Sequence, residues 1–157
     1  MTNTNFFPYG VHFQQDLEHL QKLGRVFSRF LFPGHTLGLS GALGVGKTTF
    51  ARSIIQSLCP SISFIVSPSF PLMIPYECAD FTLWHMDLFR LSHASENDLV
   101  DLGIPEILAL HPCIVEWPEY LNSIHSFQKY TLCTLSFEEK ENYRTISVQD
   151  MSCQEKI

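Results

Sequence analysis

The residues from Gly41 to Thr48 have the types and the spacing that bind phosphate. Their sequence, GALGVGKT, fits the pattern G-x4-G-K-T. Glycines at these positions let backbone N–H groups converge on phosphate oxygens. Lys47 would bring a positive charge to the outer phosphates, and the Thr48 hydroxyl would ligate Mg²⁺. The pattern therefore predicts a site for the phosphates of a nucleotide, with Mg²⁺ beside them. Its predicted binding residues are Gly41, Ala42, Leu43, Gly44, Val45, Gly46, Lys47, Thr48 and Thr49.

The residues on either side of this loop favour a phosphate site over a simple glycine turn. The apolar run Thr36–Ser40 enters the loop as an expected strand, and the amphipathic run Lys47–Leu58 leaves it as an expected helix. A helix that begins at Lys47 would point its free N–H groups and the positive end of its dipole at the same anion.

Two acidic residues follow expected strands and are candidates to work with the loop. Asp87 follows the run Phe81–Met86, and Glu116 follows Cys113–Val115. If these strands are parallel, both carboxylates lie at the edge of the sheet where the loop lies. A Mg-nucleotide site needs a carboxylate beyond the loop threonine, and hydrolysis needs a group that positions water. We expect one acid in the Mg²⁺ shell and the other at the water, without assigning which.

The expected site therefore consists of few residues. The expected catalytic residues are Lys47, Asp87 and Glu116, and the expected metal ligands are Thr48, Asp87 and Glu116.

Four further residues have two interpretations each. Ser69 could sense the nucleotide or form an ordinary Ser-Pro-Ser turn, and Trp117 could line the nucleotide pocket or belong to the core. For His85 the alternation along its strand favours a satisfied, half-buried histidine over a catalyst. For Arg90 we favour an ion pair with a nearby acid over a phosphate contact.

The remaining pattern predicts one α/β domain, residues 1–157, with the P-loop NTPase fold. Early strands that alternate with helices indicate a mainly parallel central sheet flanked by helices, closed by an antiparallel C-terminal strand pair. The expected helices are 13–32, 47–58 and one or two within 92–109. The expected strands are 35–40, 62–66, 81–86, 113–115, 130–137 and 143–148, with 70–77 an edge strand or an exposed loop. Residues 1–12 and 149–157 are expected to be poorly ordered.

Composition excludes several classes of protein. The net charge of −6 argues against a broad nucleic-acid-binding surface. Arg90 is the only basic side chain between Ser53 and Gln128, so this acidic stretch is either a solvated surface, which we favour, or a surface for a basic protein partner. No apolar run is long enough to span a membrane and no secretion signal is evident, so a cytoplasmic location is expected. The 5 cysteines are widely spread, which predicts reduced thiols.

Four stretches, in order, resemble the bacterial TsaE (YjeE) family. They are GALGVGKTTF, SPSF, HMDLFRL and VEWPE, where the family versions look like GDLGAGKTTF, SPTY or SPTF, HFDLYRL and IEWPE. The resemblance covers roughly residues 13 to 120. This chain departs from the family at Ala42, where the family usually has Asp, and at Ser69, where it usually has Thr. Pro71 and Pro75 are also unusual for the family in the segment that follows Ser69.

The resemblance implies a small P-loop ATPase that supports threonylcarbamoyladenosine formation on tRNAs reading ANN codons. It implies that the protein binds a complex of TsaD-like and TsaB-like proteins, contacts tRNA only indirectly, and resets that complex by hydrolysing ATP. The matching motifs place Lys47, Thr48, Asp87 and Glu116 at the Mg-nucleotide centre.

Two alternatives stay open. A small-molecule P-loop kinase would need an arginine-rich lid, yet Arg90 is the only arginine between residues 70 and 128. A nucleotide-dependent binding subunit without significant turnover would suit the acidic middle of the chain.

Overall fold

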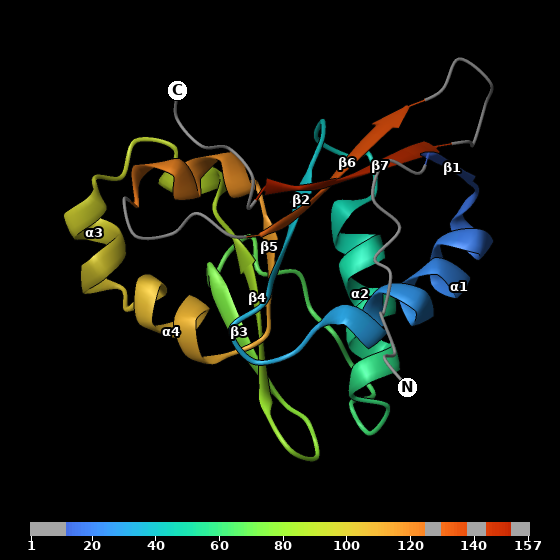
Figure 1. Ribbon diagram of the computed structural model, residues 1–157, viewed down its shortest axis with the longest axis horizontal. Coiled ribbons are helices and arrows are strands. Elements are labelled where there is room, and N and C mark those ends of the chain that lie inside the picture. Colours follow the sequence, from blue (N-terminus) through green and yellow to red (C-terminus); the bar gives the residue numbers. More distant parts are fainter. Residues whose placement is uncertain (1–11, 125–129, 138–143, 152–157) are drawn as a thin grey trace, which may run out of the picture.

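The chain forms a seven-stranded sheet with helices on both faces (Figure 1). The computed structural model describes residues 12–124, 130–137 and 144–151. The strands are β1 (His12–Gln15), β2 (Thr36–Ser40), β3 (Met73–Glu77), β4 (Thr82–Asp87), β5 (Cys113–Glu116), β6 (Thr131–Phe137) and β7 (Arg144–Asp150). Their spatial order is β1-β7-β6-β2-β5-β4-β3. The four inner strands β6, β2, β5 and β4 are parallel, whereas β7, β1 and β3 join antiparallel.

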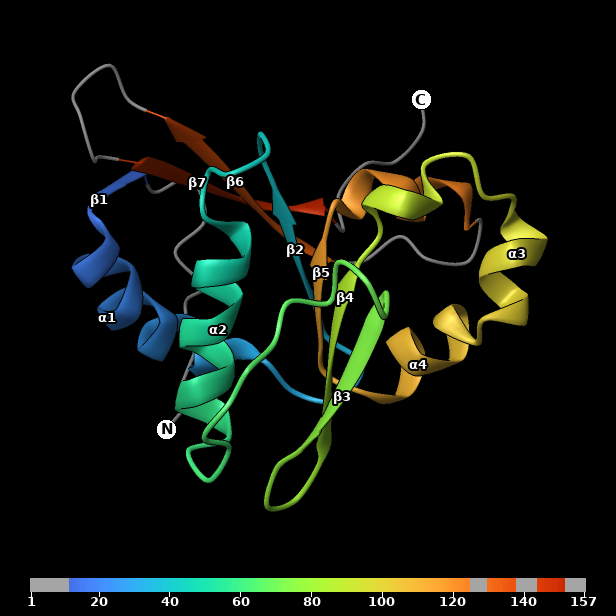
Figure 2. The same ribbon diagram turned by 180° about the vertical axis from the view of Figure 1, so that it is seen from behind.

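Two pairs of helices cover the two faces of the sheet, as Figure 2 shows from behind. On one face, α1 (Leu17–Phe27) and α2 (Lys47–Leu58) pack on Leu37, Leu83 and Ile114. On the other face, α3 (Glu96–Asp101) and α4 (Ile104–Leu110) pack on Met86 and Val115. Alternate residues of β4 and β5 thus enter two separate cores, as the pleat of a strand requires. Three short 3-10 helices complete the described elements: η1 (Ser28–Phe30), η2 (Phe89–Leu91) and η3 (Pro118–Ser123). The predicted fold class is confirmed.

The predicted helices that follow the loop are confirmed. The helix that leaves the loop has the predicted bounds, and the stretch 92–109 forms two helices separated at Gly103. Of the two alternatives for 70–77, the structure has an edge strand that includes Pro75. Proline is tolerated there because an edge strand leaves one side of its backbone unpaired. The turn expected between the two C-terminal strands lies outside the described residues.

Two predictions of secondary structure are wrong. The predicted helix from residue 13 begins only after its N-cap Asp16, because His12–Gln15 instead pair with β7. The predicted strand 62–66 is an irregular segment beside α2, where the Ile65 carbonyl oxygen accepts from Arg52 Nε at 3.1 Å. The outer edge of β4, where it could have paired, is occupied by β3.

The expected irregular ends are shorter than predicted. His12 belongs to β1, and Gln149 and Asp150 belong to β7. The reason is that β1 and β7 pair with each other, and β7 also pairs with β6 over its full length. Met151 is the last described residue, and residues 1–11 and 152–157 lie outside the described part of the chain.

The prediction that all cysteines are reduced is also wrong. Cys59, which caps the end of α2, forms a disulfide with Cys78, which follows β3. The fold brings their Cα atoms to 5.0 Å, which suits a disulfide. Spacing along the chain does not reveal this contact, because the two cysteines meet only through the packing of a helix end against the β3–β4 hairpin.

Cys113 and Cys133 are free thiols buried in the sheet, and we expect them to resist alkylation. Burial raises the pKa of Cys113 to about 12 and raises the pKa of Cys133 further. At pH 8 about one Cys113 thiol in ten thousand is then the reactive thiolate. Iodoacetamide followed by peptide mass spectrometry should find both residues unmodified in folded protein and modified in guanidinium. Rapid labelling of either residue in the folded state would contradict their burial.

Helices α1 and α2 touch at Gly24, so we expect Gly24→Ala to destabilise the fold. A Cβ at position 24 would lie 2.7 Å from the Ser53 Cβ and 2.8 Å from the Ser53 carbonyl carbon. Overpacking of this kind costs about 1–3 kcal/mol, which lowers Tm by roughly 2–4 °C per kcal/mol at this chain length. Thermal unfolding measures the effect. Exposed Gln21 on the same helix provides the control Gln21→Ala. A higher Tm for Gly24→Ala, as helix propensity alone predicts, would contradict the close contact.

Within the described residues, no helix is both long and apolar enough to cross a lipid bilayer.

Candidate phosphate-binding and metal site

The glycine-rich loop joins the end of β2 to the first residue of α2 and has the backbone shape that only glycine adopts easily. Gly41 has φ +138°, and a side chain there would collide with the Leu135 carbonyl oxygen of β6. Gly46, the N-cap of α2, has φ +112°. These conformations strain any residue with a Cβ. The glycines of the motif are therefore required by the turn itself.

The N-terminus of α2 is open toward the loop. Among the described residues no side chain caps this helix, and its first turn contains no acidic residue. Its leading N–H groups and dipole therefore favour an anion at the loop. This arrangement agrees with the predicted phosphate site.

Lys47 is buried at the start of α2 and is held by the loop itself. Its Nζ donates to the carbonyl oxygens of Gly41 at 2.7 Å and Ala42 at 3.0 Å. The same ammonium lies 4.0 Å from the centroid of the Trp117 ring, a cation–π distance. Burial lowers the pKa of Lys47, while the nearby carboxylates of Glu116 and Asp87 oppose this shift. The positive charge of Lys47 therefore lies inside the loop.

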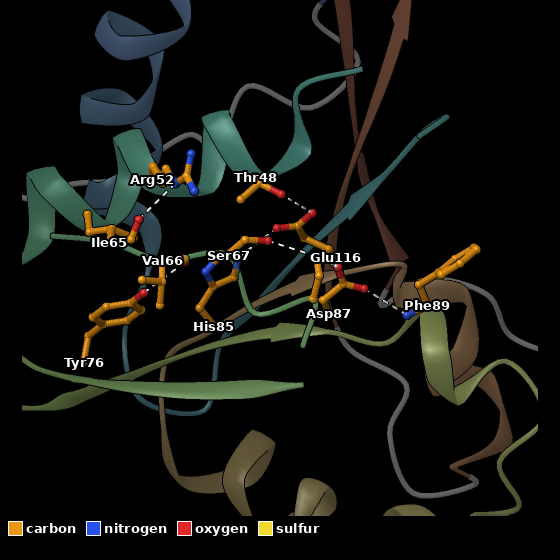
Figure 3. A network of polar contacts seen from close by, with 11 residues as sticks. Thr48, Arg52, Ile65, Val66, Ser67, Tyr76, His85, Asp87, Phe89 and Glu116 are labelled. Carbon is orange, nitrogen blue, oxygen red and sulfur yellow. Dashed lines mark hydrogen bonds and ion pairs between the residues drawn. The ribbon is translucent and has the colours of Figure 1, made fainter. Parts of the chain in front are cut away.

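Thr48, Glu116 and His85 form a chain of hydrogen bonds beside the loop (Figure 3). The Thr48 hydroxyl donates to Glu116 Oε2 at 2.9 Å, and His85 Nε2 lies 2.9 Å from Glu116 Oε1. Glu116 and His85 are 2% and 0% exposed. The P-loop strand β2 pairs directly with β5, so the carboxyl end of β5 brings Glu116 next to the first turn of α2.

Asp87 lies beside Glu116 but has different partners. The two residues are register partners at the ends of β4 and β5. Ser69 Oγ donates to Asp87 Oδ2 at 2.9 Å, and the Phe89 backbone N–H donates to Oδ1 at 3.0 Å. The structure thus places Lys47, Thr48, Asp87 and Glu116 at one edge of the sheet, and the SPSF segment reaches this edge through Ser69.

The donor set fits magnesium. Thr48, Glu116 and Asp87 offer hard oxygen atoms, which Mg²⁺ prefers, and Mg²⁺ in nucleotide sites takes only one or two carboxylates and completes its shell with phosphate and water. The described residues contain no group of three or more His, Cys, Asp and Glu side chains arranged to hold a metal.

All four ambiguous residues now have defined contacts, and that of Ser69 is its hydrogen bond to Asp87. His85 is fully buried rather than half-buried, and it touches Glu116. Trp117 has φ +60° and is half-buried between Lys47 and Phe89, whose ring centroid lies 4.9 Å away. The prediction for Arg90 is wrong. Its Nη1 donates to the Phe70 carbonyl at 3.0 Å and its guanidinium lies 5.7 Å from the Phe70 ring, rather than beside an acid.

Sequence reasoning missed Arg144. Its Nε donates to the Val45 carbonyl oxygen of the loop at 2.6 Å. Arg144 begins β7 and is 99 positions from Val45. No motif contains it, so only the antiparallel return of β7 along β6 reveals that it supports the loop.

These features define the class of the chain: a P-loop NTPase fold in which the strand-end carboxylate of Glu116 binds the loop threonine and that of Asp87 lies next to Glu116. The sequence model of the family described as "Threonylcarbamoyl adenosine biosynthesis protein TsaE" matches residues 14–146. The chain belongs to the TsaE family.

Relatives and a solved structure agree with this assignment. The tRNA threonylcarbamoyladenosine biosynthesis protein TsaE of Rickettsia conorii is 30% identical over 151 residues, covering 89% of this chain and 85% of the relative. The protein of the same name from Bacillus subtilis is 36% identical over 102 residues, covering 64% of this chain and 61% of the relative. The crystal structure of Bacillus subtilis YdiB has a TM-score of 0.73 at 24% identity, covers 90% of this chain and 85% of its own, and supports the fold.

Proposed function

We propose that this protein is a Mg-dependent ATPase that serves threonylcarbamoyladenosine modification of tRNA. Family membership supports the pathway, since the relatives carry that biosynthesis in their names. The observation that carries the ATPase assignment is the contact between the Thr48 hydroxyl and Glu116, next to a buried Lys47. A phosphate loop alone would only bind a nucleotide, whereas a carboxylate bonded to the loop threonine provides the metal-binding half of a hydrolytic site.

The contacts also suggest how the two acids divide their roles. Glu116 is bonded to Thr48, the loop residue expected to hold Mg²⁺, so we assign Glu116 and Thr48 to the metal. Asp87 lies one strand farther from β2 and is fixed by Ser69 and the Phe89 amide, so we assign it to the attacking water. Bound Mg²⁺ would neutralise charge on the phosphate oxygens.

The chain's own residues supply the remaining chemistry. Lys47 exchanges the carbonyl oxygens of Gly41 and Ala42 for phosphate oxygens, which are the stronger acceptors. The loop amides and the start of α2 stabilise the negative charge. Asp87, held by two donors, orients a water without having to reorganise. Catalysis on this scheme is mainly positioning and charge stabilisation.

The proposed partners are TsaD-like and TsaB-like proteins, with tRNA contacted only through them and in the cytoplasm. This proposal is supported by the family resemblance and by the acidic stretch from Ser53 to Gln128, which does not suit direct tRNA binding. ATP turnover by the protein alone is expected to be slow and to depend on these partners.

Reconstitution tests the function. Purified protein, its cognate TsaD-like and TsaB-like proteins, tRNA, ATP and Mg²⁺ are combined, and threonylcarbamoyladenosine is measured by nucleoside mass spectrometry over several turnovers. We expect sustained modification only when this protein is present. Equal modification in its absence would remove the protein from the pathway, and a phosphorylated small molecule found in an acceptor screen would favour a kinase.

A further inference from the structure

His85 is buried at the catalytic edge of the sheet, yet the proposed function gives it no role. It lies on β4 two residues before Asp87, so both side chains leave the same face of the strand. Its side chain is 0% exposed and contacts Glu116 from the neighbouring strand β5. Because His85 contacts a proposed metal ligand, it can affect the metal site, which a histidine that only fills the core cannot do.

The contacts identify which ring nitrogen carries the proton. An ionised carboxylate can only accept, so the 2.9 Å contact to Glu116 Oε1 requires a hydrogen on Nε2. Within the described residues Nδ1 is buried and has no hydrogen-bond partner. A hydrogen on Nδ1 would be a buried donor without an acceptor, which is costly. The contacts therefore assign the ring hydrogen to Nε2.

This hydrogen bond constrains the orientation of Glu116. His85 occupies Oε1, whereas Oε2 faces the Thr48 hydroxyl. Without a donor on Oε1, one oxygen of a buried carboxylate would be unsatisfied, and the group could turn to present both oxygens to the loop. Mg²⁺ demands near-octahedral geometry at short distances, which a carboxylate satisfies best through a single oxygen.

We propose that His85 is a positioning residue that holds Glu116 so that Oε2 alone faces Thr48 and the metal site. The proposal rests on the proposed function, in which Glu116 and Thr48 hold Mg²⁺. To that function the proposal adds His85 as the residue that fixes the orientation of the Glu116 carboxylate. Partners that orient a metal ligand in this way typically change metal affinity by about 10- to 100-fold when they are removed.

Two substitutions separate positioning from packing. His85→Met keeps the length of the side chain and removes the donor, whereas His85→Gln keeps an N–H group at a similar reach. The Mg²⁺ dependence of ATP-analogue binding is measured by titration calorimetry of the analogue at a series of Mg²⁺ concentrations. We expect His85→Met to raise the half-saturating Mg²⁺ concentration about tenfold. We expect His85→Gln to have a half-saturating Mg²⁺ concentration close to that of the wild type. Thermal unfolding of each variant reports on packing separately.

A double-variant comparison tests whether His85 acts through Glu116. In a Glu116→Ala background, His85→Met should not raise the half-saturating Mg²⁺ concentration further, because the carboxylate that His85 positions is absent. Additive losses would overturn the proposal. So would a His85→Met variant with the wild-type Mg²⁺ dependence, or a His85→Gln variant no better than His85→Met.

Spectroscopy of the protein without metal and nucleotide gives a readout independent of activity. The ¹⁵N shifts of the His85 ring should show hydrogen on Nε2 and bare Nδ1, and Glu116→Ala should move the Nε2 signal. A hydrogen on Nδ1 in place of Nε2 overturns the proposal even if His85→Met does not fold. Wild-type protein that binds no Mg-nucleotide, but shows the expected tautomer and its response to Glu116→Ala, would contradict the proposed function while supporting the fixed orientation of Glu116.

Discussion

Replacing Lys47 with alanine should weaken ATP binding by about 30-fold or more. Its ammonium is buried in the loop, where it donates to two carbonyl oxygens and contacts the Trp117 ring. Losing one partner of a buried, charged hydrogen-bonded pair costs about 2–5 kcal/mol, and each 1.4 kcal/mol is tenfold in affinity. Titration calorimetry with a non-hydrolysable ATP analogue and Mg²⁺ measures the change.

Lys22→Ala is the matched control, because Lys22 is exposed on α1. It should bind the analogue within about twofold of wild type, since exposed substitutions are usually worth under ~0.5 kcal/mol. Thermal unfolding must show that Lys47→Ala is folded. Affinity within threefold of wild type in folded Lys47→Ala protein would mean that the glycine-rich loop is not the phosphate site.

Glu116→Gln should bind ATP but turn it over at least about 100-fold more slowly. The amide keeps the shape of the side chain and an acceptor for one of the two donors, His85 and Thr48, but it loses the charge. Removal of one preorganised electrostatic group commonly costs about 10²–10³ in rate. Phosphate release by the reconstituted complex measures turnover, and calorimetry measures binding.

Glu119→Gln is the control for this substitution. Glu119 lies three positions away on η3 and is exposed. Its variant should retain wild-type turnover. If Glu116→Gln protein lost turnover yet sustained tRNA modification at the wild-type rate, hydrolysis would be dispensable, and a nucleotide-dependent binding subunit would be the better description.

The parts of the structure that could be predicted from sequence are those set by neighbours along the chain. The loop follows from glycines whose φ angles other residues rarely adopt, and α2 follows from an apolar face at helical spacing. The position of Asp87 and Glu116 follows from the rule that parallel strands end at a common edge, and the register pairs the two residues directly.

The parts that could not be predicted depend on residues distant in sequence. Nothing near residues 12–15 indicates that their partner is β7, although Asp16, which accepts from the His19 amide, is an N-cap signal. The apolar run 62–66 has strand-like composition, but β3 occupies the place where it could pair. The Cys59–Cys78 disulfide and the hydrogen bond between His85 and Glu116 likewise join elements that meet only in the folded chain.

The hydrogen bond from Arg144 to Val45 has a consequence for biosynthesis. The loop residues Gly41–Thr48 leave the ribosome early, whereas Arg144 is added 99 residues after Val45. Strand β6, whose Leu135 carbonyl closes over Gly41, also comes late. A nascent chain that already contains the whole phosphate-binding motif therefore still lacks two of its structural supports. The proposed nucleotide site is completed only when the C-terminal hairpin has been translated and has docked beside β2.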